Sequence, residues 1–97
     1  MHVLQLSQLH VVAVGNKLRA HVEVAVPQPA TASAVGVKCG ASVDGHRLRV
    51  VVNVYRNGRA RCAWVLHDRD YGRMAKGFVR VRQARTHVRA RFLTAVR

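Results

Sequence analysis

Hydrophobic and polar residues alternate along most of the chain, with the two-residue period of a β-strand. The clearest example is KLRAHVEVAV (17–26), in which every second residue from Leu18 is apolar and most of the residues between are charged or polar. AVGVKCGASV (34–43) repeats the pattern. Valine, which dominates these segments, is stiff at χ1 and packs well on a pleated surface. No segment shows a convincing helical period, so the pattern predicts an all-β protein.

Turn residues divide the predicted strands. Pro27 and Pro29 are expected to end the first of them, because proline has no N–H to donate to a sheet. Asp44-Gly45 predicts a tight turn after the second. A further strand is expected near residues 9–14, and DRDYGRMA (68–75) is typical of a loop.

The segment LRVVVNVYRNGRARCAWVL (48–66) predicts a hairpin. A two-residue loop at Asn57-Gly58 would set Val54 opposite Arg61 and mix apolar with charged faces. A three-residue loop that begins at Arg56 keeps the faces apart, so we predict the longer loop, with Gly58 left-handed. Its register pairs Val54 with Ala60, Val52 with Cys62, Val50 with Trp64 and Leu48 with Leu66. The other face then carries Arg49, Asn53, Tyr55, Arg59 and Arg61.

A closing hairpin is predicted from KGFVRVRQ (76–83) and HVRARFLTAV (87–96), joined by ART (84–86). Together the segments make about seven antiparallel strands, which suits a β-sandwich or a small barrel. The 97 residues are enough for one modest core, and they contain no internal repeat, low-complexity tract or linker. We therefore predict a single domain over residues 1–97.

Both cysteines fall on apolar faces of their predicted strands. In a sandwich that places the third and fifth strands in opposite sheets, inward Cys39 and Cys62 can meet across the core, with Trp64 packed beside them. A disulfide here would add about 3 kcal/mol of stability. The alternative is two free buried cysteines, which behave as small hydrophobic residues. We favour the disulfide, because two inward cysteines in a small β domain suit an oxidising compartment.

The segment from residue 34 to residue 96 resembles the immunoglobulin-like domains of secreted, mainly actinobacterial, bacterial proteins. Its distinctive element is the Cys-x-Trp sequence of Cys62 and Trp64. The matching positions are Val37, Cys39, Ala41, Gly45, Leu48, Gly58, Ala60, Cys62, Trp64, Gly72, Arg73 and Phe92. The resemblance implies a single immunoglobulin-like sandwich that acts as a non-catalytic accessory, adhesion or spacer module.

Basic residues far outnumber acidic ones, with 17 lysines and arginines against four acids and a net charge of +13 at pH 7. Such a balance favours polyanionic partners. A compositional origin is the alternative, because high-GC genomes enrich arginine, alanine, valine and glycine together.

The strongest candidate site is an arginine stripe on the closing hairpin. It comprises Arg80, Arg82, Arg85, Arg89 and Arg91. The predicted register pairs 82 with 89 and 80 with 91, and such like-charge pairs are unfavourable without counterions. We predict that the stripe binds an acidic polysaccharide or other polyanion, with nucleic acid as the alternative ligand. A merely solvated outer face is the third interpretation. The sequence does not place a second basic group relative to the stripe; this group comprises Arg47, Arg49, Arg59 and Arg61.

Other chemistry is weakly represented. Asp68, Asp70 and Gly72 form a fragment of a calcium loop that lacks further oxygen ligands, and neighbouring Arg69 and Arg73 are expected to neutralise the acids. The six histidines form no triad or ligand set. We predict no catalytic residue, no metal, no cofactor and no enzymatic activity.

The expected location is extracellular or in the cell envelope, with a cytoplasmic protein as the alternative. No apolar run approaches the roughly 18 residues that cross a membrane. The N-terminal MHVLQLSQLHVVAV has neither a basic leader nor a small-residue cleavage site. We therefore expect the chain to be a fragment of a longer secreted protein.

Overall fold

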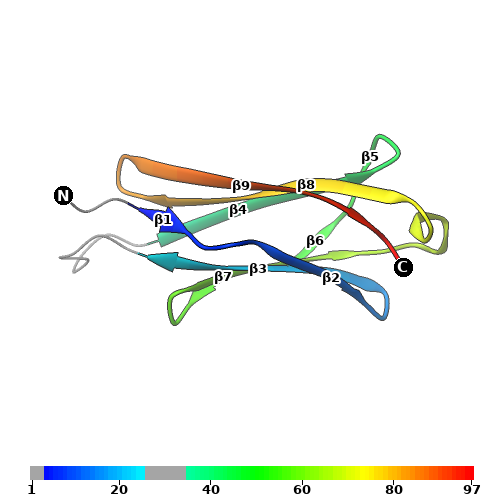
Figure 1. Ribbon diagram of the computed structural model, residues 1–97, viewed down its shortest axis with the longest axis horizontal. Helices are drawn as coiled ribbons and strands as arrows, with labels where there is room; N and C mark the ends of the chain where they lie inside the picture. The colour runs from blue at the N-terminus through cyan, green and yellow to red at the C-terminus, as the bar shows by residue number, and fades with distance from the viewer. Residues whose placement is uncertain (1–3, 26–34) are drawn as a thin grey trace.

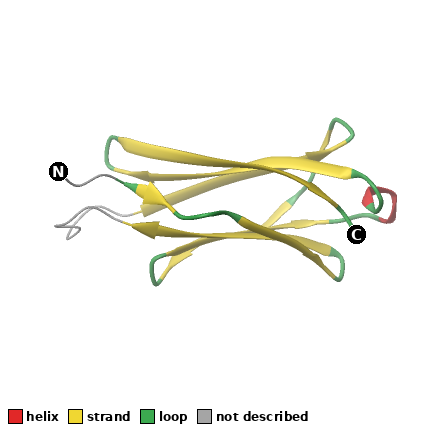
Figure 2. Cartoon of the chain, in the orientation of Figure 1, coloured by secondary structure: helices red, strands yellow, loops and turns green. Residues whose placement is uncertain are grey.

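The chain folds into two antiparallel β-sheets packed face to face (Figure 1). This computed structural model describes residues 4–25 and 35–97. Figure 2 shows that strands make up both layers, with a short helical turn at one end of the sandwich. The predicted all-β sandwich is confirmed. Pro27 and Pro29, which we expected to end a strand, lie outside the described residues.

The first sheet has five strands. Its central pair is β3 (Lys17–Ala25) and β7 (Arg59–Val65), which lie antiparallel. β1 (Gln5–Leu6) and β2 (His10–Val14) both pair with β3, and β6 (Val50–Arg56) forms the edge beside β7. The expected strand near residues 9–14 is β2.

The second sheet has four strands in the order β5-β4-β8-β9. They are β5 (His46–Arg47), β4 (Val35–Val43), β8 (Met74–Gln83) and β9 (Thr86–Ala95). The described residues contain nine strands rather than the expected seven, because β1 and β5 are two-residue strands that leave no periodicity to detect. The predicted loop over residues 68–75 instead contains a 3₁₀ helix, η1 (Asp68–Asp70), and the first residues of β8.

The core lies between the sheets and is built from the alternating apolar faces. Leu18, Val22, Val79 and Val81 are fully buried there, as their positions at every second residue require. Trp64 is 0 % exposed, and its ring centroid lies 5.6 Å from that of Phe92 on the opposite sheet. Small and medium aliphatic side chains thus surround one large aromatic pair.

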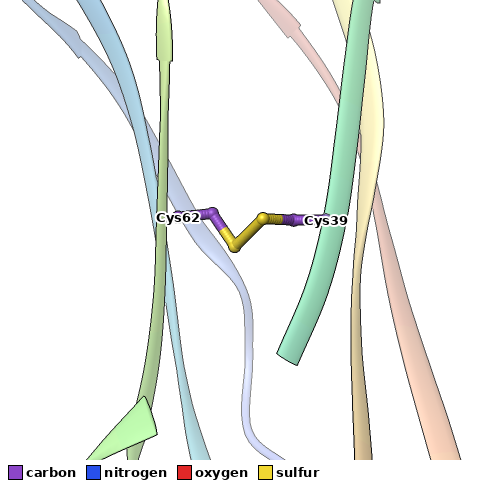
Figure 3. Close-up of a disulfide and its surroundings, with 2 residues drawn as sticks. All are labelled: Cys39 and Cys62. Atoms are coloured by element: carbon purple, nitrogen blue, oxygen red, sulfur yellow. A yellow bond between two sulfur atoms is a disulfide. The ribbon is translucent and has the colours of Figure 1, made fainter. Parts of the chain in front are cut away.

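A disulfide joins Cys39 on β4 to Cys62 on β7 and so links the two sheets (Figure 3). The two Cα atoms are 6.5 Å apart, within the span that a disulfide bridges. Both residues are buried. The prediction from the apolar faces of two separate strands is confirmed.

The register of the β6–β7 hairpin differs from our prediction. Asn57 and Gly58 form a two-residue turn with φ values of 53° and 75°, the combination of a type I′ turn. Val54 therefore lies opposite Arg61, the pairing we rejected. An irregularity between Val50 and Val52 then shifts the strand by one residue, so that Val50 still faces Trp64 as predicted.

The faces of β6 change accordingly. Asn53 lies opposite Cys62 and Tyr55 opposite Ala60, so both are on the core side of the sheet rather than beside the arginines. Val52 and Val54 take the outward positions. The predicted register of this hairpin is wrong because the alternating period of β6 is interrupted. The irregularity at Val51 adds one residue to the strand.

Candidate polyanion-binding face

The outward face of the four-stranded sheet carries the arginine stripe. Val79, Val81 and Gln83 of β8 are buried, so the residues that alternate with them point away from the core. Arg80 and Arg82 occupy these positions, and Arg89 and Arg91 occupy the equivalent ones on β9. Arg85 is exposed in the turn between the two strands.

The pairing of the arginines differs from the predicted one. Gln83 pairs with Thr86, so the turn has two residues rather than three, and Ala84 in it has a positive φ of 54°. This register sets Arg80 opposite Arg89, Arg82 opposite His87 and Arg91 opposite Phe78. The like-charge contact therefore persists at one position, and the other two arginines face uncharged or weakly basic partners.

A third cation extends this pair into a row across the sheet. Lys38 on β4 lies opposite Arg80, which lies opposite Arg89. Residues directly opposite on antiparallel strands have Cβ atoms about 5 Å apart, and like charges at such positions are destabilising. The alternation along 34–43 places Lys38 on the outward face of its strand, but nothing in the sequence shows that β4 and β8 are neighbours.

The acidic residues do not neutralise this row. Glu23 pairs with Arg59 on the other sheet, at 3.2 Å, and Asp44 pairs with Arg73, at 2.6 Å. Asp70 is buried and lies against His46. Within residues 4–25 and 35–97, which include all four acids, no carboxylate forms an ion pair with a cation of the stripe. The charge of the row is therefore not compensated by an acid within the described part of the protein.

Phe78 holds one arginine of the row in place. The Cζ atom of Arg89 lies over the Phe78 ring, 4.9 Å from its centroid, in a cation–π contact. The ring itself lies against Gly40 of β4, where an added Cβ would come within 2.8 Å of it. Arg89 is thereby oriented by an aromatic ring rather than by an acid, and its hydrogen-bond donors are left for a ligand.

A groove lies beside the row. It includes residues of the segment in which the chain passes from β5 in one layer to β6 in the other, and Figure 1 shows the path of that segment. The crossing segment is held from both sides: Leu48 N–H donates to Ala41 O at 2.9 Å, and Val65 N–H donates to Arg49 O at 3.0 Å. The groove has a volume of about 990 Å³. Its basic lining residues are Lys38, Arg47, Arg49, Lys76, Arg89 and Arg91.

The structure thus divides the second basic group. Arg47 and Arg49 join the stripe through the groove. Arg59 and Arg61 lie on the outward face of β7 in the other sheet. Lys76 was not among the predicted site residues, although the alternation that places Arg80 and Arg82 outward also places Lys76 outward.

A histidine pair lies on that other outward face. His10 and His21 are cross-strand partners, and their rings stack with centroids 5.0 Å apart. Burial, then the adjacent His10, then Arg59 and Arg61, lower the pKa of His21 below its ordinary value of 6.5. The pair supplies only two ligands, and the described part of the chain contains no group of three or more residues placed to hold a metal ion.

Asp70 is a buried carboxylate that is held by contacts within the protein. Its side chain is 0 % exposed, its Oδ2 accepts a 2.8 Å hydrogen bond from the His67 N–H, and its Oδ1 lies 2.9 Å from His46 Nε2. The expectation that Arg69 and Arg73 neutralise the acids of this loop is therefore wrong for Asp70, and Arg73 pairs with Asp44 instead. A buried carboxylate held in this way fixes η1 against β5.

Comparison with known proteins provides no further identification. No protein-family model, no curated protein and no solved structure matches this chain. Across the described residues, no helix has the length and apolar character needed to span a membrane.

Proposed function

We propose that this protein is a non-catalytic accessory module of a secreted or cell-envelope protein, and that it binds acidic polysaccharide through the outward face of its four-stranded sheet. One observation carries the proposal: Lys38, Arg80 and Arg89 form a cross-strand row without a carboxylate partner among the described residues. Such a row stores repulsion that a bound anion relieves. Arginine suits this role, because its planar fork binds sulfate, phosphate and carboxylate groups through two hydrogen bonds.

The disulfide supports an extracellular location. Structural disulfides persist in oxidising compartments and are rare in the cytosol. Cys39 and Cys62 are buried together between the sheets, where an inter-sheet link stabilises a small sandwich.

The strand order supports the resemblance to immunoglobulin-like domains. With β1 and β2 counted as one strand and the short β5 set aside, one sheet has the order first-second-fifth-fourth. The other has the order third-sixth-seventh. Constant-type immunoglobulin domains have this arrangement. In such sandwiches the sheet faces and end loops are free to bind partners while the core holds them in place.

Acidic polysaccharide is favoured over nucleic acid by the scarcity of available aromatic faces. Proteins that bind single strands stack bases on exposed aromatic rings. On this face the Phe78 ring is covered by Arg89, and Tyr55 lies on the core side of β6. No recognition helix exists in the described residues to enter a DNA groove. Contacts to a flexible acidic polymer need neither feature.

The test is binding to a sulfated polysaccharide and to duplex DNA of equal charge over a salt series, by fluorescence anisotropy. The stripe variant replaces Arg80, Arg82, Arg89 and Arg91 with glutamine. Its matched control replaces four exposed arginines elsewhere, namely Arg19, Arg56, Arg69 and Arg97, and removes the same charge.

We expect the polysaccharide to bind the wild type at physiological salt and the stripe variant to lose that binding. The control should retain most of it. Equal losses in both variants would show that net charge alone is responsible. A preference for DNA that persists as salt rises would replace polysaccharide with nucleic acid as the ligand.

A further inference from the structure

The groove beside the cationic row has the character of a site for a single ligand rather than a length of polymer. Its six basic residues come from four separate parts of the chain: β4, the β5–β6 segment, β8 and β9. Its lining contains no aspartate or glutamate. Charges gathered from distant segments around one concave surface focus their potential on whatever enters it.

Part of the groove lining is apolar. These residues, here called the floor, are Gly40, Ala41, Leu48, Val50, Phe78 and Phe92. Val50 is 37 % exposed, so it offers an apolar surface within reach of a ligand. The groove therefore combines basic residues with apolar ones, and its ligand must match both.

Sugar rings carrying acidic groups have this combination. One face of a pyranose ring presents C–H groups that pack on apolar side chains, and sulfate or carboxylate groups project from the ring edge. We propose that this groove binds one or two residues of an anionic saccharide, with Arg47, Arg49 and Arg91 holding the acidic groups and Val50 contacting the ring. The inference rests on the proposed function and specifies where on the face recognition takes place.

A nucleotide fits the groove less well than a sugar does. A base requires an open aromatic face for stacking, and the face of Phe78 is already occupied by the Arg89 guanidinium, 4.9 Å from the ring centroid. The remaining floor residues are aliphatic or glycine, apart from the half-buried Phe92. Aliphatic surface is adequate for the C–H face of a sugar.

Val50→Glu is the decisive substitution, because it places an acid on the apolar floor and changes no cation. Val54→Glu is its matched control: it introduces the same charge on the same strand, at a residue that is 46 % exposed and does not line the groove. A second comparison sets Arg47→Gln/Arg49→Gln against Arg19→Gln/Arg56→Gln, which removes equal charge from residues outside the groove. Thermal unfolding of each variant confirms that the fold is retained.

The probes are a sulfated tetrasaccharide, a galacturonate tetrasaccharide and a single-stranded DNA tetranucleotide, each titrated calorimetrically at physiological salt. We expect Val50→Glu and the Arg47/Arg49 variant to weaken binding of at least one saccharide by about tenfold or more, as the loss of a charge-assisted contact implies. The two controls should change it less than about twofold. The saccharide that binds more tightly identifies sulfate or carboxylate as the preferred group.

Two results would overturn the inference and leave the proposed function standing. In the first, the long polysaccharide binds through the stripe but neither tetrasaccharide binds. In the second, the groove variants and their controls lose affinity equally. Tighter binding of the tetranucleotide than of either saccharide would assign the groove to another ligand class. If the long polysaccharide itself does not bind the wild type, the proposed function fails first.

Discussion

Arg80 and Arg89 lie directly opposite each other on β8 and β9, and Lys38 lies on the other side of Arg80. Arg80 is half-buried between these two cations. A protein selected only for stability would gain from an acid at this position, since opposite charges on facing strands stabilise a sheet. The row is therefore where stability and anion binding are expected to oppose each other.

Arg80→Glu should stabilise the protein and weaken its binding to polyanions. The new carboxylate would face Lys38 and Arg89 at once, and we expect a gain of about 1 kcal/mol in the free energy of unfolding. Urea unfolding measures this gain, and titration with a sulfated polysaccharide measures the loss. Arg82→Glu is the control, because its neighbours across the sheet are Gly36 and His87 and the gain should be smaller. Destabilisation by Arg80→Glu would show that the row carries no significant repulsion.

Removal of the disulfide should lower stability substantially. Cys39 and Cys62 are 23 residues apart in sequence, and a bridge closing a loop of this size contributes about 3 kcal/mol. We expect the Cys39→Ala/Cys62→Ala variant to lose about this amount in urea unfolding. Intact mass after alkylation without reductant provides the direct check on the wild type. Two alkylated cysteines under those conditions would contradict the bridge.

Asp70→Ala should destabilise the end of the sandwich. The substitution leaves the part-buried His67 N–H without its acceptor and His46 without its carboxylate, and the loss of such interactions at a buried carboxylate costs about 2 kcal/mol. Asp68→Ala is the matched control, since Asp68 belongs to the same 3₁₀ helix but is exposed. We expect it to change the free energy of unfolding by less than about 0.5 kcal/mol. Equal effects from the two substitutions would mean that Asp70 has no special structural role.

Stability should fall as the medium is acidified through the ordinary pKa of histidine. Burial and the neighbouring His10, Arg59 and Arg61 lower the pKa of His21 in the folded protein. Below pH 6.5 the unfolded chain therefore binds a proton at this residue more readily than the folded chain does, so stability is lost as the pH falls and levels off below the folded pKa. Urea unfolding at pH 7.5 and at lower pH values measures this slope.

His21→Gln should flatten that slope, and His10→Gln should flatten it only in part, because burial of His21 is the larger cause. An unchanged slope in His21→Gln would assign the pH dependence to other groups. His10 and His21 stack on the outward face of the first sheet, so neither substitution alters the anion-binding face.

Much of the fold could be predicted from local patterns. Alternation along 17–26 and 34–43 was sufficient to identify two long strands and their buried faces, because one strand face must be apolar to pack on the core. It also placed Cys39 and Cys62 inward on separate strands, from which the disulfide followed. The register of the β6–β7 hairpin could not be predicted in this way. The turn at Asn57-Gly58 and the irregularity at Val51 each shift the strand pairing by one residue. Alternation alone does not distinguish their combined effect from a longer loop.

The candidate site was predicted only in part. Arg80, Arg82, Arg89 and Arg91 share a face because they occupy alternating positions on adjacent segments, a property that the sequence by itself determines. Their contact with Lys38 depends on β4 lying beside β8, and their proximity to Arg47 and Arg49 depends on the path of the chain between the two sheets. Strand order and crossing paths result from long-range packing, to which residues distant in sequence contribute together. The face on which each arginine lies is thus determined by the local sequence. The groove in which the cations meet is determined by the tertiary structure.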